Sequence, residues 1–129
     1  ILVVENVKGA QGATAKTLTQ YGYEVLEVAN AQEALQLILS KKSRVFDCVL
    51  CDIVQPGMTG VEMRRQLQKT HPDLSVILLS GSPDQFLMQD AGLNVPEPHL
   101  RRPFTAPALL AKVQEVQRDR ARLVTAGQA

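Results

Sequence analysis

Residues that could take part in group-transfer chemistry follow several apolar segments of the chain, each at the point where a segment ends. They come after the first, third, fourth and a short fifth segment: Glu5 and Asn6, Asp52, Ser80, and Arg102. A carboxylate such as Asp52 can act as a nucleophile and form an acyl phosphate. Phosphoryl transfer needs mainly in-line positioning and charge neutralisation, which a Mg²⁺ ion held by neighbouring oxygens supplies. The residue types are therefore compatible with phosphoryl transfer to Asp52.

Four apolar segments have the length of strands, at residues 1–4, 25–28, 45–53 and 74–79. Three of them are nearly continuous in Val, Ile and Leu, as is typical of strands covered on both faces of a parallel sheet. A short fifth strand is expected around His99 and Leu100. With helices between the strands, the pattern predicts one α/β domain built on a doubly wound sheet. Ligands of such sheets bind beyond the carboxyl ends of the strands, where the polar residues lie.

Three helices are predicted from capping residues and apolar periodicity. Asn30 is expected to cap a helix with one apolar stripe, and Met63 with Leu67 marks a weaker helix after Gly60. The clearest helix has Thr105 as its N-cap and Pro107 in its first turn. The stripe residues are Ala34, Leu35, Ile38 and Leu39 in the first helix, and Leu109, Val113 and Val116 in the last. A short further candidate covers residues 85–91.

Length and charge restrict the class of protein. The 129 residues correspond to one ordinary domain, which we expect to cover residues 1–118, with residues 119–129 extending the last helix or forming a linker. A formal net charge of +1 lacks the basic stripe of a dedicated DNA-binding domain. No apolar segment approaches the ~20 residues that span a bilayer, so a cytoplasmic location is expected. Because the chain starts without Met inside a strand, we expect it to be part of a longer protein.

Cys48 and Cys51 form a C-x-x-C pattern, which would suggest a redox pair if it began a helix. Here the two thiols lie in a segment that reads as a buried strand. Residues three apart on a strand point to opposite faces, so we predict two inert core side chains.

The segments ILVVEN, CDIVQPGMTG, VILLSGS and LRRPF, in that order, resemble the receiver domains of two-component response regulators and hybrid histidine kinases, over nearly the whole chain. The resemblance implies a flavodoxin-like five-stranded sheet of order 2-1-3-4-5. It also implies a phosphoacceptor domain, not an enzyme in itself, that receives a phosphoryl group from a histidine kinase or its phosphotransfer domain. An attached output or kinase domain is implied as the recipient of the signal, and the Leu-Ser-Gly motif favours a hybrid sensor kinase.

The same resemblance implies the roles of individual residues. Asp52 would be the phosphoacceptor, and Ser80 would donate its hydroxyl to a phosphoryl oxygen. Arg102 occupies the position where the family usually has a lysine. The implied Mg²⁺ ligands are Asn6 directly, Glu5 through water, Asp52, and the backbone carbonyl of Val54. His99 falls at the position of the family's switch aromatic, and a half-exposed edge-strand residue is the equally weighted alternative.

Two departures from the family pattern affect the predicted site. The usual acidic pair is Glu5 and Asn6, so one negative charge is missing. At ~4 Å and an effective dielectric of about 20, a unit charge is worth a few kcal/mol of Coulomb attraction, so weaker Mg²⁺ binding is expected. Arg102 keeps the positive charge but replaces a compact ammonium with a planar guanidinium.

Three other functions were weighed against the phosphoacceptor. Asn6, Arg102 and His99 motivate a pseudo-receiver, an interaction module that keeps the fold and signals without phosphate. A phosphatase or dehalogenase-like hydrolase needs a second acid-base carboxylate two residues after Asp52, where Val54 stands. A flavin site lacks its hydroxyl-rich phosphate loop, so no cofactor beyond a divalent ion is implied.

A partner surface is expected around the fifth strand and the last helix, if the domain responds as the family does. It would include His99, Arg101, Lys112 and Arg118. Because a charged helical face is usually only solvated, this surface is a weak prediction.

Overall fold

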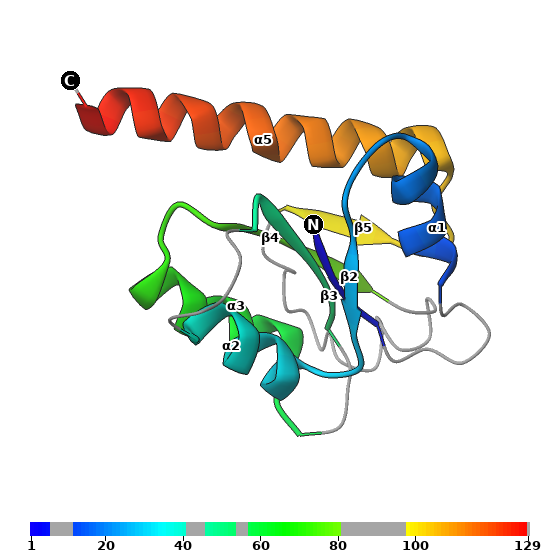
Figure 1. Ribbon diagram of the computed structural model, residues 1–129, viewed down its shortest axis with the longest axis horizontal. Coiled ribbons are helices and arrows are strands. Elements are labelled where there is room, and N and C mark those ends of the chain that lie inside the picture. The colour runs from blue at the N-terminus through cyan, green and yellow to red at the C-terminus, as the bar shows by residue number, and fades with distance from the viewer. Residues whose placement is uncertain (6–11, 41–45, 54–56, 81–97, 129) are drawn as a thin grey trace, which may run out of the picture.

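Five parallel strands form a single sheet in the order β2-β1-β3-β4-β5, as Figure 1 shows. A computed structural model describes residues 1–5, 12–40, 46–53, 57–80 and 98–128, with side chains to residue 119. The strands are β1 (Leu2–Val4), β2 (Leu26–Val28), β3 (Cys48–Asp52), β4 (Ser75–Ser80) and β5 (His99–Arg101). All four neighbouring pairs are parallel. The predicted doubly wound sheet and its order are confirmed.

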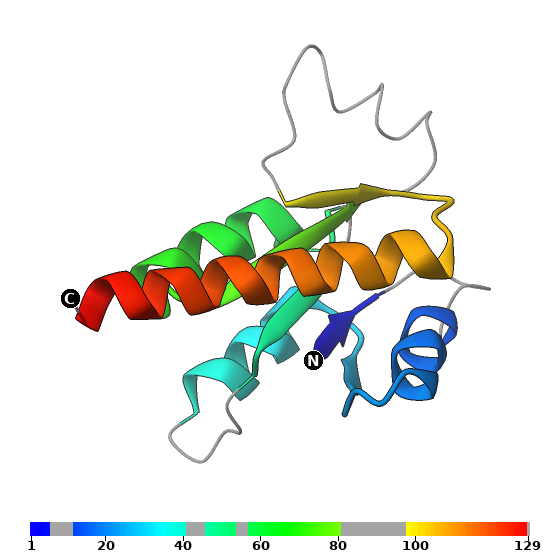
Figure 2. The same cartoon turned by 90° about the horizontal axis from the view of Figure 1, so that it is seen from above.

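Helices cover both faces of the sheet, which gives the three layers visible in Figures 1 and 2. On one face lie α1 (Ala13–Gln20) and α5 (Ala106–Gln128), and on the other lie α2 (Ala31–Leu39) and α3 (Gly60–Thr70). Each face has its own apolar cluster: Leu18, Leu109 and Val113 belong to the first, and Ala34 and Met63 to the second. The sheet is therefore packed from both sides, as its continuous apolar strands predicted.

The central strand β3 contributes side chains to both clusters in alternation. All five of its residues are buried. Cys48 and Leu50 pack in the cluster under α1 and α5, whereas Val49 and Cys51 pack in the cluster under α2 and α3. Both cysteines are free thiols. The prediction of two core thiols on opposite faces of a strand is confirmed.

The helix ends follow the capping signals. Asn30 Oδ1 accepts from the backbone N–H of Glu33 at 2.9 Å, and Thr105 Oγ1 accepts from that of Ala108 at 3.2 Å. Leu109, Val113 and Val116 are buried, as predicted. Leu39 was wrongly assigned to the buried stripe, because it ends α2 and half of its surface is exposed. The candidate helix at residues 85–91 lies outside the described residues.

Two helices differ from what the sequence indicated. The eight-residue α1 had no predicted range, because it buries only Thr14, Ala15 and Leu18. The 23-residue α5 runs without a break through residue 119 to Gln128. Within the described residues, no helix is long and apolar enough to cross a membrane.

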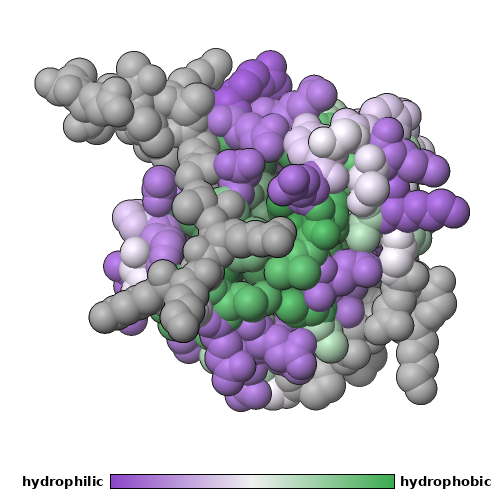
Figure 3. Space-filling view, viewed as in Figure 1, coloured by the Kyte–Doolittle hydropathy of each residue, from purple (hydrophilic) through white to green (hydrophobic). Residues whose placement is uncertain are grey.

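The sheet edge formed by β2 carries apolar surface. Figure 3 shows hydrophobic side chains in the middle of this face, with hydrophilic ones around them. Leu26 of β2 is 38% exposed and Tyr21, just after α1, is 61% exposed. The cores of both layers therefore come close to the surface along β2.

Candidate functional site

The carboxyl ends of the strands lie together, toward the right of Figure 2. Glu5 follows β1, Asp52 ends β3, Ser80 ends β4 and Arg102 follows β5. Glu5, Asp52 and Ser80 are at most 5% exposed, and they make up three of the four buried polar residues among those described. The carboxyl edge of the sheet is therefore the place where polar groups enter the interior, as the strand pattern predicted.

Arg102 joins the two carboxylates of this edge. Its Nη2 lies 2.5 Å from Glu5 Oε2 and 2.6 Å from Asp52 Oδ1. The side chains of Glu5 and Asp52 are each 3% exposed, and that of Arg102 is 16% exposed. The structure thus brings together three predicted site residues, and it adds a contact that the sequence did not indicate, with one nitrogen bridging both acids.

The backbone of β4 and β5 holds Arg102 in position. The Arg102 backbone N–H donates to the Ser80 carbonyl oxygen at 3.2 Å, and Nη1 lies 3.4 Å from the same oxygen. The peptide bond between Arg102 and Pro103 is cis. Arg102 is therefore anchored at its backbone while its guanidinium reaches across two strands to Glu5.

Burial and charge act in opposite directions on the titration of this cluster. Desolvation raises the pKa of Glu5 above its ordinary value, and the nearby Asp52 raises it further, while Arg102 and Thr14 lower it. For Arg102, burial alone would lower the pKa, but hydrogen bonds and Coulomb attraction from Glu5 and Asp52 leave it raised. Arg102 therefore stays charged, and Glu5 depends on it for much of the stabilisation of its own charge.

Thr14 is a site residue that the sequence analysis missed. It is buried in α1, and its hydroxyl donates to Glu5 Oε2 at 3.1 Å. Nothing in the local pattern marks it, because a threonine in a short helix is usually a surface residue. Its position relative to Glu5 follows from the packing of α1 beside the end of β1.

Gly60 allows the first turn of α3 to approach the end of β3. Its backbone N–H donates to the Ile53 carbonyl oxygen at 3.0 Å. A Cβ at this position would overlap the backbone carbonyl oxygen of Asp52. The absence of a side chain at residue 60 is therefore part of what positions Asp52.

Ser80 supplies a hydroxyl that is buried but not engaged. Its Oγ has no hydrogen-bond partner among the described residues. Since an unsatisfied buried hydroxyl costs free energy, such a group in an otherwise satisfied edge is a candidate for contact with a ligand.

The remaining predicted residues fall in different places. His99 is half-buried in β5 and pairs in register with Leu78, while Arg101 is exposed. Lys112 lies 3.4 Å from Glu115 on α5, and Arg118 is exposed on the same helix. Asn6 and Val54 lie outside the described residues.

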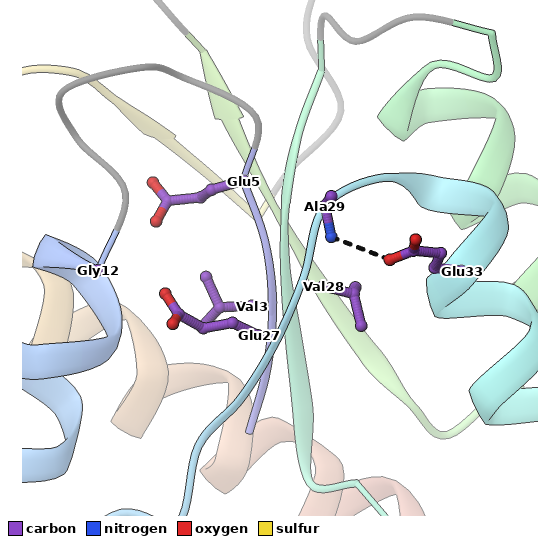
Figure 4. A pocket seen from close by; sticks show the side chains of 7 residues that line it. All are labelled: Val3, Glu5, Gly12, Glu27, Val28, Ala29 and Glu33. Atoms are coloured by element: carbon purple, nitrogen blue, oxygen red, sulfur yellow. Dashed lines mark hydrogen bonds between the residues drawn. The ribbon is translucent and has the colours of Figure 1, made fainter.

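A pocket of about 410 Å³ opens beside Glu5, between β2 and the beginnings of α1 and α2. Figure 4 shows that the carboxylates of Glu5 and Glu27 both point toward the α1 side, whereas Glu33 turns away to accept from the Ala29 backbone N–H at 3.2 Å. The surroundings of Glu5 are therefore acidic on the side away from Arg102.

The donor set of the edge suits a hard cation. Glu5 Oε1 is buried and has no hydrogen-bond partner among the described residues. Glu5 and Asp52 offer carboxylate oxygens, the ligand type that Mg²⁺ prefers. They are only two, and the described residues hold no group of three or more His, Cys, Asp or Glu that could bind a metal. Oxygens beyond these two side chains are needed to complete such a site.

Comparisons with known proteins agree on one family. The family model of the response regulator receiver domain matches residues 1–114. The chain is 31% identical to the sensor kinase CckA of Brucella abortus over 116 residues, which are 90% of this chain and 12% of that protein. It is 32% identical to the response regulator MprA of Mycolicibacterium vanbaalenii, over 92% of this chain and 50% of that protein.

Solved structures support the same fold. A CheY-like response regulator receiver domain protein from Methanospirillum hungatei superimposes with a TM-score of 0.73 at 27% identity, covering 94% of each chain. NtrX from Brucella abortus gives a TM-score of 0.81 at 23% identity, over 98% of this chain and 28% of NtrX. The chain therefore spans half or less of the curated relatives described above, but all of a single-domain structure.

Proposed function

The chain belongs to the response regulator receiver domain family, phosphoacceptors of two-component signalling, and on that premise we propose that Asp52 is the residue that is phosphorylated. The observation that supports this assignment most directly is the burial of its carboxylate at the end of the central strand, 2.6 Å from the Arg102 guanidinium. A buried carboxylate beside a fixed cation stays ionised, and an ionised carboxylate is the form that attacks phosphorus.

The transfer step uses groups that already face this edge. An Asp52 oxygen attacks phosphorus and forms the new O–P bond while the P–N bond of a donor phosphohistidine breaks, and the electron pair of that bond stays on the imidazole. The Ser80 hydroxyl, buried and without a described partner, donates to a phosphoryl oxygen. Arg102 supplies positive charge to the same oxygens.

We propose Mg²⁺ as the cofactor of this step, held by Asp52, by Asn6, by the Val54 carbonyl and, through water, by Glu5. When bound, it neutralises charge on the phosphoryl oxygens. The unpartnered Glu5 Oε1 and the oxygen-only donor set support this assignment.

The domain is a signalling module that exchanges phosphate with a histidine kinase or a phosphotransfer partner and is attached to further domains. We propose that the longer protein is a hybrid sensor kinase or a response regulator, with this domain in the cytoplasm. The CckA and MprA matches support one alternative each. His99, Arg101, Lys112 and Arg118 are the proposed responding surface, because β5 and α5 adjoin Arg102.

The assignment is tested by intact-mass measurement after incubation with a small phosphodonor and Mg²⁺. We expect one added phosphoryl group on the wild-type domain and none on Asp52→Asn. Asp47→Asn is the matched control, because Asp47 is an exposed carboxylate just before the same strand, and it should be phosphorylated normally.

A variant with Asn6→Asp and Arg102→Lys separates the competing functions. Absence of the adduct in both the wild type and this variant would rule out Asp52 as phosphoacceptor. An adduct in the variant alone would identify a pseudo-receiver disabled by those two residues.

A further inference from the structure

We propose that the Arg102 guanidinium is a built-in counter-ion that competes with the divalent cation, so that metal binding requires Arg102 to leave its bridge between Glu5 and Asp52. This inference rests on the proposed phosphoacceptor site and concerns how that site is controlled. It makes Arg102 a positioning residue whose place depends on whether metal is present.

The competition follows from the use of a single atom. Nη2 contacts an oxygen of Glu5 at 2.5 Å and an oxygen of Asp52 at 2.6 Å. Mg²⁺ binds oxygen ligands at about 2.0–2.1 Å. A cation that used these two oxygens would take the space that Nη2 now occupies, so the two cannot be present together.

Electrostatics gives the same result if the metal uses other oxygens of the two carboxylates. All three side chains are largely buried, so solvent screens their charges only weakly. A divalent ion within a few ångström of a guanidinium is repelled, and the two acids already have their charge partly balanced by Arg102. The metal-free site is therefore stabilised at the expense of metal affinity.

The geometry also gives Arg102 a route out of the bridge. Its side chain is the most exposed of the three, at 16%, and its backbone N–H remains held by the Ser80 carbonyl oxygen. The guanidinium can turn outward from this fixed base without disturbing β5. Once released, it lies where an incoming phosphoryl group would need a cation.

The test is a Mg²⁺ titration of the whole chain by isothermal calorimetry. We expect Arg102→Gln to bind Mg²⁺ about tenfold or more tightly than the wild type, because a buried positive charge beside the ion is removed. Arg101→Gln removes the same charge from the exposed neighbour on β5 and should change the affinity by less than about twofold. Phosphorylation plays no part in this measurement.

Thermal unfolding guards against a variant that folds poorly without metal. In EDTA, Arg102→Gln should melt at a lower temperature than the wild type, because two buried carboxylates lose their shared partner. Mg²⁺ should then raise its melting temperature more than it raises that of the wild type. Arg102→Lys, which keeps one charge but cannot contact both acids in the same way, should fall between the two.

Equal or weaker Mg²⁺ affinity in folded Arg102→Gln would overturn the proposal, as would equal stabilisation of both proteins by Mg²⁺. Failure of all three proteins to bind Mg²⁺ would also overturn it, because Arg102 would then not be what keeps the ion out. None of these results bears on Asp52, which the mass measurement tests separately.

Discussion

The apolar layers and the carboxyl edge of the sheet are built from the same strands but are stabilised in different ways. In the layers, many buried side chains share the stabilisation, with 14 core residues in the α2 and α3 cluster alone. At the edge, two buried carboxylates depend on one guanidinium and one hydroxyl. The layers tolerate the loss of single contacts, whereas each polar contact at the edge affects the charges that would carry the chemistry.

The largest effect on stability is expected in the layers. Leu78 of β4 is fully buried, so Leu78→Ala should lower the free energy of unfolding by about 2–5 kcal/mol, from lost transfer energy and a cavity. Leu39→Ala removes the same atoms from a half-exposed position and should cost less than about 0.5 kcal/mol. Urea unfolding of both variants measures the difference, and similar costs would contradict the burial described for the two leucines.

The contact between the layers and the edge is tested at Gly60. Gly60→Ala should destabilise the domain by about 1–3 kcal/mol, because the new Cβ overlaps the Asp52 carbonyl oxygen. In an unobstructed helix the same change stabilises by about 0.5–1 kcal/mol, so the sign of the effect is diagnostic. The phosphorylated fraction of Gly60→Ala should also fall in the mass measurement. A stabilised variant with normal phosphorylation would show that α3 does not constrain Asp52.

A smaller effect is expected when the edge loses one neutral donor. Thr14→Val should lower the free energy of unfolding by about 1.5 kcal/mol, because Glu5 loses a buried hydrogen bond while it keeps Arg102. Thr19→Val is the matched control, since Thr19 is exposed on the same helix. Urea unfolding in EDTA checks both. If the two variants were equally stable, the Thr14 hydroxyl would contribute nothing to the edge.

The smallest effect is a pH dependence from Glu5. Its pKa is raised in the folded domain, so its contribution to stability is fully present below the ordinary value of 4.5 and is lost as pH rises through the higher folded pKa. In EDTA, the wild type should therefore lose stability over this range relative to Glu5→Gln, whose side chain does not titrate. The difference is small because Arg102 and Thr14 oppose the desolvation. The opposite slope would mean that Arg102 outweighs burial.

Much of the fold could be predicted from the sequence because the signals are local. Continuous Val, Ile and Leu segments identified buried parallel strands, and alternation along β3 placed Cys48 and Cys51 on opposite faces. Asn30 and Thr105 identified the starts of two helices through their caps. Leu39 was misassigned because periodicity does not indicate where a helix passes beyond the sheet that covers it.

The candidate site divides along the same line. The sequence by itself determined which residues reach the carboxyl edge, since parallel strands end there together: Glu5, Asp52, Ser80 and Arg102. Only the tertiary structure decided how they meet, with Arg102 bridging acids 97 and 50 residues away and Thr14 donating to Glu5. These contacts depend on distances across strands and on the packing of α1, which no local pattern records.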